Sequence, residues 1–126
     1  MQKPCVLLAE DNEDQREACT ILLQMQGFEV RGVANGKEAL EELQRSPPDV
    51  ILTDIMMPEM DGLELVEHVK ENAEYAHLPI VVMTGSELGY LTWAWSKGAN
   101  ETLAKPFSSE DLYTAILNVL PESMGH

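Results

Sequence analysis

Five polar side chains in this sequence each follow a short apolar run, and their types suit the chemistry of a phosphoryl group. They are Glu10, Asp11, Asp54, Thr84 and Lys105. Three carboxylates brought together repel one another, and a hard divalent cation such as Mg²⁺ resolves that conflict because it prefers oxygen ligands. Beside such a metal, a carboxylate can act as a nucleophile while a hydroxyl and an ammonium stabilise phosphoryl oxygens. The residue types therefore predict phosphoryl transfer if the fold brings them together.

The apolar runs before these residues predict buried strands. In the clearest run, Val50, Ile51, Leu52 and Thr53 lead directly into Asp54. A short run of this kind, bounded by turn residues, is typical of a strand buried on both faces in a parallel sheet. The carboxyl ends of parallel strands meet along one edge of the sheet, where ligands bind. We therefore expect the five polar side chains to share one small cleft.

Helical patterns alternate with the strands along the chain. We expect strands at 6–9, 28–31, 50–54, 79–83 and 101–104, the second of them at an edge of the sheet. We expect helices over a stripe ending at Gly27, over 37–45, after Gly62, over about 88–97, and from Ser108 to 120. Asp61 is expected to cap the third helix, and Ser108 with Asp111 has the spacing of a capping box. This alternation predicts an α/β fold, a three-layer, open, doubly wound, five-stranded parallel sheet.

Two helices carry apolar residues whose orientation the spacing predicts. In the first helix the inward stripe is expected to be Ala18, Ile21, Leu22 and Met25. In the fourth helix the stripe is expected to be Tyr90, Leu91, Ala94 and Trp95. Trp93 lies about 200° around that helix from Trp95, so both rings cannot face the core. Trp93 is then either a surface residue or part of a patch for a partner or for self-association.

Length, charge and cysteine content exclude several classes of protein. The 126 residues, 44% of them hydrophobic, indicate one globular domain. The formal net charge of −14 argues against nucleic acid or an anionic membrane as a direct partner. Cys5 and Cys19 are expected to be free thiols. No signal peptide or membrane span is visible, so a reducing, cytoplasmic location is expected.

Each of the five polar residues also has a purely structural interpretation when it is taken alone. An aspartate at a strand end is commonly a turn or cap residue, and an acidic pair before a helix is favoured by the helix dipole. A threonine in the position of Thr84 is commonly a cap, and Lys105 alone would be a solvated lysine. Only their joint placement after four strands, in this order, favours function.

With these residues in place, the chain resembles the receiver domain of two-component response regulators, including the single-domain chemotaxis receivers. The resemblance extends from Val6 to about Leu120. Its motifs are Glu10-Asp11, Asp54 followed by Met-Met-Pro-Glu-Met-Asp-Gly, Thr84-Gly85, Gly98-Ala99 and Lys105-Pro106-Phe107. It implies a flavodoxin-like sheet with strand order 2-1-3-4-5. Together with the length of the chain, it predicts a single receiver domain over 1–126 with a core at about 5–120. After Pro121 ends the last helix, we expect a frayed tail at 121–126.

The resemblance implies a role for each site residue. Asp54 would accept a phosphoryl group from the histidine of a sensor histidine kinase or of a phosphotransfer protein. Asp11, Asp54 and the backbone carbonyl of Met56 would hold Mg²⁺, with Glu10 helping directly or through water. Thr84 and Lys105 would bind the phosphoryl oxygens, and Lys105–Pro106 would be a cis peptide. Such a domain is a signalling phosphoacceptor, not an enzyme, although it hydrolyses its own aspartyl phosphate slowly.

The same resemblance implies output to an unknown downstream protein through the face formed by the fourth helix, the fifth strand and the last helix. Two features depart from the family pattern. First, Thr102 occupies the position, three residues before the lysine, where the family usually has an aromatic residue that moves on phosphorylation. Second, the segment from Thr84 to Lys105 is one residue shorter than in chemotaxis-type receivers. Met56 and Ser86 occupy the positions that flank the path of the attacking water. Because Met56 offers that water no hydrogen bond, we expect modest autodephosphorylation.

Two other functions remain open from the sequence. The first is an interaction module of the same fold that works without phosphorylation, and Thr102 favours it. The second is a dedicated Mg²⁺-dependent phosphohydrolase using Asp54, which would need a cap over a small substrate. No segment is long enough for such a cap.

Overall fold

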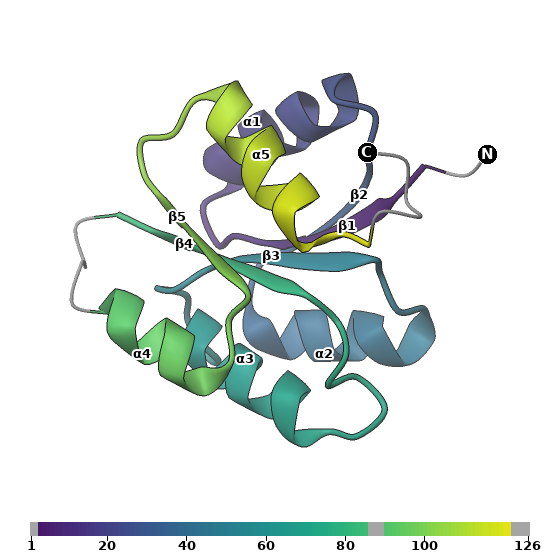
Figure 1. Ribbon diagram of the computed structural model, residues 1–126, viewed down its shortest axis with the longest axis vertical. Helices are drawn as coiled ribbons and strands as arrows, with labels where there is room; N and C mark the ends of the chain where they lie inside the picture. Colours follow the sequence, from purple (N-terminus) through teal and green to yellow (C-terminus); the bar gives the residue numbers. More distant parts are fainter. Residues whose placement is uncertain (1–2, 86–89, 122–126) are drawn as a thin grey trace.

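The computed structural model describes residues 3–85 and 90–121, without the side chains of 90–92. Its five strands form one parallel sheet in the order β2-β1-β3-β4-β5, as predicted. The strands are β1 (Cys5–Ala9), β2 (Glu29–Val33), β3 (Val50–Asp54), β4 (Ile80–Thr84) and β5 (Glu101–Ala104). The helices are α1 (Glu13–Met25), α2 (Gly36–Arg45), α3 (Gly62–Glu71), α4 (Tyr90–Lys97) and α5 (Ser109–Val119). Helices α1 and α5 cover one face and α2, α3 and α4 the other, which confirms the three-layer prediction (Figure 1).

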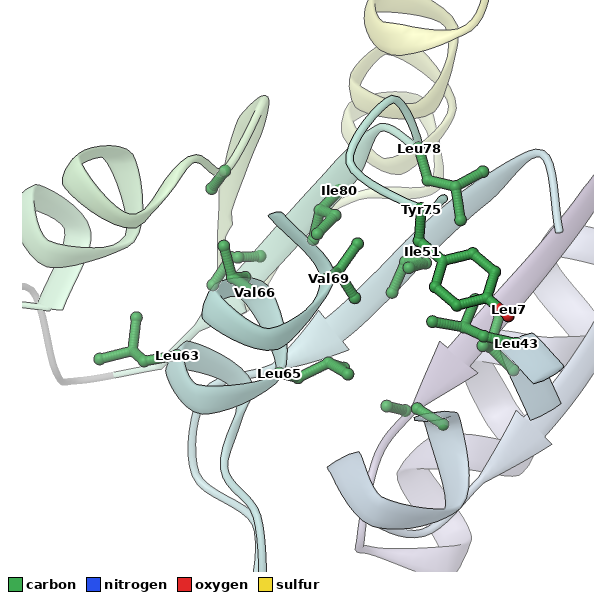
Figure 2. Close-up of a cluster of buried hydrophobic side chains, with 14 of the residues drawn as sticks. Leu7, Leu43, Ile51, Leu63, Leu65, Val66, Val69, Tyr75, Leu78 and Ile80 are labelled. Atoms are coloured by element: carbon green, nitrogen blue, oxygen red, sulfur yellow. The ribbon is translucent and has the colours of Figure 1, made fainter. Parts of the chain in front are cut away.

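Side-chain alternation along the strands divides the core into two clusters. Leu7 and Ile51 belong to the cluster beneath α2 and α3, whereas Leu8 and Leu52 belong to the cluster on the α1 and α5 side. Successive residues of a strand point to opposite faces, so a strand that is apolar throughout requires cover on both. Figure 2 shows the first cluster, in which Val69 of α3 and its neighbours pack on the central strands.

The register of the sheet aligns the carboxyl ends of the strands. Ala9 pairs with Thr53, Asp54 pairs with Met83, and Thr84 pairs with Ala104. The residues that follow β1, β3, β4 and β5 therefore emerge along one edge. None of the helices in the described part of the chain is long and apolar enough to cross a membrane.

Polar side chains cap four helices at their amino ends. The caps are Asn12, Asn35, Asp61 and Ser108. The Asp61 cap is confirmed, and so is the capping box that Ser108 forms with Asp111. Each such cap satisfies amide groups that a helix leaves unpaired at its start.

The predicted inward stripe of α1 is largely wrong, since only Leu22 of its four residues packs against the core. The buried residues of this helix are Cys19 and Leu23, whereas Ile21 is 49% exposed and Met25 is 79% exposed. The inner face of the helix is therefore rotated relative to the predicted stripe, and a polar contact lies near it. Half-buried Arg16 donates from Nη1 to the backbone carbonyl of Glu10 at 2.8 Å, a contact that apolar spacing cannot indicate.

The predicted stripe of α4 is also only partly correct. Ala94 is fully buried, but Trp95 is 49% exposed and Trp93 is 59% exposed. Both indole rings therefore lie largely outside the core. Helix α4 packs on the sheet against β4 and β5. The side chains of Tyr90 and Leu91, the other two residues of the predicted stripe, lie outside the described part of the structure. The predicted start of this helix at 88 falls outside the described residues, as does the tail at 122–126.

Candidate functional site

Asp54 lines an acidic cleft at the carboxyl edge of the sheet. It is the last residue of β3, and its side chain is only 13% exposed. The cleft has a volume of about 300 Å³, and its lining includes Asp11, Met56 and Gly85. Carboxylate oxygens of Glu10, Asp11 and Asp54 lie within 4.8 Å of one another. The structure thus brings together the three carboxylates that the sequence singled out.

Lys105 reaches into this cleft from the end of β5. Its Nζ donates to Glu10 Oε1 at 2.8 Å, to Gln15 Oε1 at 3.0 Å and to Asp54 Oδ2 at 3.3 Å. The backbone of Lys105 is fixed as well, because its N–H donates to the carbonyl of Thr84 at 2.7 Å. The Lys105–Pro106 peptide bond is cis, as the resemblance implied.

The backbone around Asp54 is closely packed. Asp54 Oδ1 accepts a hydrogen bond from the N–H of Ile55 at 2.9 Å. Gly62, the first residue of α3, approaches so closely that a Cβ there would lie 2.1 Å from the carbonyl oxygen of Asp54. No other residue type fits, since only glycine lacks that atom. The N–H of Gly36 donates to the carbonyl of Met60 at 3.0 Å and anchors the loop between β3 and α3.

Burial and the ion pair set the electrostatics of the cleft. Burial raises the pKa of Asp54 to about 6; Lys105 lowers it and Glu10 raises it. Burial alone would lower the pKa of Lys105, but hydrogen bonds and charge from Glu10 and Asp54 outweigh that effect and raise it. Near neutral pH the ionised, nucleophilic form of Asp54 is therefore available without a general base to deprotonate it.

The donor set of the cleft fits Mg²⁺. Three carboxylates and one ammonium leave two uncompensated negative charges within a few ångströms. All three potential ligands are oxygens, and Asp11 is exposed, which leaves room for the water molecules that Mg²⁺ retains. Met56 lines the same cleft from the loop after β3.

The other candidate residues lie at different depths. Thr84 is fully buried at the end of β4, on the strand next to Asp54. Thr102 is half-buried in β5, and Ser86 lies outside the described residues. Sequence reasoning missed Gln15, whose side chain contacts Lys105. The feature that could have identified Gln15 is its place in the first helical turn, three positions after the Asn12 cap, because it does not follow a strand.

An apolar cavity of about 670 Å³ adjoins the acidic cleft. It lies between α1 and the segment after β5, with Ala18, Leu22 and Phe107 in its lining. Glu10, Gln15, Gly85 and Lys105 line both spaces, so the cavity opens onto the site.

The model of the response regulator receiver domain family matches residues 6–117. This chain belongs to that family. Among its relatives, Histidine kinase P4 of Formosa agariphila is 34% identical over 98% of this chain and 9% of its own length. Two-component response regulator ORR11 of Oryza sativa subsp. indica is 34% identical over 94% of this chain and 82% of its own. The structure of chemotaxis protein CheY4 of Vibrio cholerae has a TM-score of 0.87 and 33% identity, and covers 94% of this chain and 100% of its own.

Receivers of this family are signalling proteins of two-component systems rather than true enzymes. The same domain occurs in larger proteins, and this receiver spans only 8–12% of the length of three histidine kinases that it matches.

Proposed function

We propose that this receiver accepts a phosphoryl group on Asp54 from a phosphohistidine of a sensor histidine kinase or phosphotransfer protein. The observation that carries the proposal is the half-buried carboxylate of Asp54, whose Oδ2 lies 3.3 Å from Lys105 Nζ. In the transfer, a carboxylate oxygen of Asp54 forms a bond to phosphorus and the bond from phosphorus to the imidazole nitrogen breaks. The electron pair of that bond leaves with the imidazole.

The surrounding residues have distinct roles in this proposal. Lys105 neutralises charge on the phosphoryl oxygens, and Thr84 donates a hydrogen bond to one of them. Mg²⁺ would be held by Asp11, Asp54 and the carbonyl of Met56, with Glu10 directly or through water. When bound, the metal supplies positive charge to the phosphoryl oxygens.

The exposed, apolar Met56 offers no hydrogen bond to an attacking water, so autodephosphorylation should be modest. Met56→Asn should shorten the lifetime of the acyl phosphate several-fold.

The apolar cavity beside the cleft is the proposed docking site for the phosphohistidine-bearing partner. It shares four lining residues with the acidic cleft, so a side chain presented by a protein seated there would enter directly at Asp54.

Output is proposed through the α4, β5 and α5 face. The exposed Trp93 and Trp95 support a contact surface on α4, either for a downstream protein or for self-association.

We also propose that residues 1–126 act as a single receiver unit in the cytoplasm. Cys5 and Cys19 are both free, which suits a reducing compartment. Burial raises the pKa of Cys19 to about 11, so this thiol stays protonated and unreactive.

Intact mass after incubation with acetyl phosphate and Mg²⁺ tests the main proposal. Wild-type protein should gain one phosphoryl group, and Asp54→Asn should gain none. A gain that persists in Asp54→Asn would place the acceptor elsewhere. If wild-type protein gains nothing, beryllofluoride binding separates rapid hydrolysis from a module that works without phosphorylation. The half-buried Thr102 favours this second function, because it cannot provide the volume of the usual switch aromatic.

A further inference from the structure

All three N–H donors of Lys105 are engaged in the unphosphorylated protein. Glu10, Gln15 and Asp54 each accept one hydrogen bond from Nζ, at 2.8, 3.0 and 3.3 Å. An ammonium group has only three donors, so a new acceptor can bind only by displacing one of these. Binding of a phosphoryl oxygen to Lys105 therefore requires an exchange.

We expect a phosphoryl oxygen to replace the hydrogen bond between Lys105 and Asp54. It is the longest of the three. When Asp54 becomes an acyl phosphate, its carboxylate loses its negative charge and the phosphoryl oxygens carry charge instead. The strength of a charge-assisted hydrogen bond depends on that charge, so Lys105 follows it from the carboxylate to the phosphoryl group. Glu10 and Gln15 then retain the other two donors.

Gln15 is held where it can do this. It lies in the first turn of α1, and its backbone N–H donates to the side chain of the Asn12 cap at 2.9 Å. Its side chain lines both the acidic cleft and the adjoining apolar cavity. Because Glu10 and Gln15 accept two of its hydrogen bonds, the ammonium stays in place while its third donor can exchange partners.

We infer that Gln15 is a positioning residue, which holds Lys105 so that its third donor meets the phosphoryl group. This inference rests on the proposed function of Asp54. A lysine on a flexible four-carbon stem loses rotamer freedom when it binds an anion. An acceptor that has already ordered the lysine reduces that cost.

The test measures beryllofluoride binding in the presence of Mg²⁺ by titration calorimetry. Gln15→Met keeps the length of the side chain and removes its acceptor. It should weaken beryllofluoride binding by about two- to tenfold, the loss expected for one hydrogen bond. Mg²⁺ binding without beryllofluoride and the melting temperature should stay unchanged, because Gln15 is exposed and is not in the carboxylate cluster. Gln24→Met is the control, an exposed glutamine of the same helix that lines neither the cleft nor the apolar cavity.

A double-mutant cycle separates positioning from a general effect on the site. In a Lys105→Met background, Gln15→Met should cause no further loss, because its effect acts through Lys105. Beryllofluoride binding by Gln15→Met that equals or exceeds that of wild type overturns the inference. An equal loss in the Lys105→Met background overturns it too. If wild-type protein does not bind beryllofluoride with Mg²⁺, the proposed function of Asp54 fails first.

Discussion

The carboxyl group of Asp54 experiences two opposing effects at the residue scale. Burial favours its neutral form, whereas the ammonium of Lys105 favours its ionised form. Burial has the larger effect, so the site holds a negative charge at neutral pH at some cost in stability. Such a cost is acceptable at a nucleophile, whose reactivity depends on a charge that is incompletely compensated.

The pH dependence of stability should reveal this cost. The pKa of Asp54 is raised from 3.8 to about 6 on folding, so the folded state binds the proton more tightly. The stability that this tighter proton binding gives the folded state is complete below pH 4, and it is lost as the pH rises through 6. Asp54→Asn removes that loss and should raise the free energy of unfolding at pH 7 by up to about 3 kcal/mol. Urea unfolding of both proteins between pH 4 and 7 measures the difference. A difference that does not grow with pH would contradict the expectation.

Metal binding should stabilise the fold through Asp11. A ligand that binds only the folded state adds about 2.7 kcal/mol at one hundred times its dissociation constant. We therefore expect Mg²⁺ to raise the melting temperature of wild-type protein and to have little effect on Asp11→Asn. Asp14→Asn is the matched control, because Asp14 is an exposed carboxylate in the first turn of α1 and is not part of the cluster. Equal Mg²⁺ effects in all three proteins would indicate non-specific binding.

The carboxylates and Lys105 were predictable because each follows a strand, and parallel strands bring their ends together. Gln15 was not predictable in that way. Its proximity to Lys105 depends on how α1 begins after the Asn12 cap, which accepts a hydrogen bond from the Gln15 N–H. Strand ends can be located from apolar runs, but the direction of a helical side chain requires the packed structure.

At the scale of elements, α1 serves both the core and the proposed docking site. Its inner face is narrow, with Cys19 and Leu23 buried, and exposed Ala18 borders the apolar cavity. The predicted stripe missed this division, because the count of apolar residues includes Ile21 and Met25, which face solvent. Strand boundaries were more reliable, since β3 and β5 have the bounds that the sequence predicted.

A substitution at Ala18 should separate protein docking from phosphoryl chemistry. Ala18→Gln places a longer side chain at the apolar cavity without adding charge. We expect transfer from a phosphohistidine-bearing partner to slow by at least tenfold, while phosphorylation by acetyl phosphate stays near the wild-type rate. Glu17→Gln, one position earlier on α1 and outside the cavity lining, should affect neither rate. Equal slowing with both donors would contradict a docking role for the cavity.

At the scale of the whole molecule, a single sheet supports two separate surfaces. The acidic cleft lies at the carboxyl edge of the sheet, and the exposed rings of Trp93 and Trp95 lie on α4. The topology and the strand order were predictable because alternating strands and helices permit few arrangements. The role of the α4 surface was not, because exposure of a tryptophan does not identify the partner.

The surface around Trp93 should contribute to association. A buried tryptophan removes about 150–250 Å² from water. If Trp93 lies in an interface, Trp93→Ala should therefore weaken self-association, or binding of an output partner, by about tenfold or more. Sedimentation velocity with and without beryllofluoride measures self-association. Met25→Ala, a highly exposed apolar residue on α1, is the control. Unchanged association of Trp93→Ala in both states would leave this ring as a simple surface residue.

The contact between Lys105 and Glu10 joins positions that are 95 residues apart in the chain. During synthesis on the ribosome, Glu10, Asp11 and Asp54 emerge long before β5 and its lysine. A nascent chain can thus contain the acceptor aspartate and still lack the cation that completes the cleft. Phosphate uptake by a growing chain should therefore begin only after β5 has joined the sheet. Acquisition of the phosphoryl group would therefore report that β5 has joined the sheet.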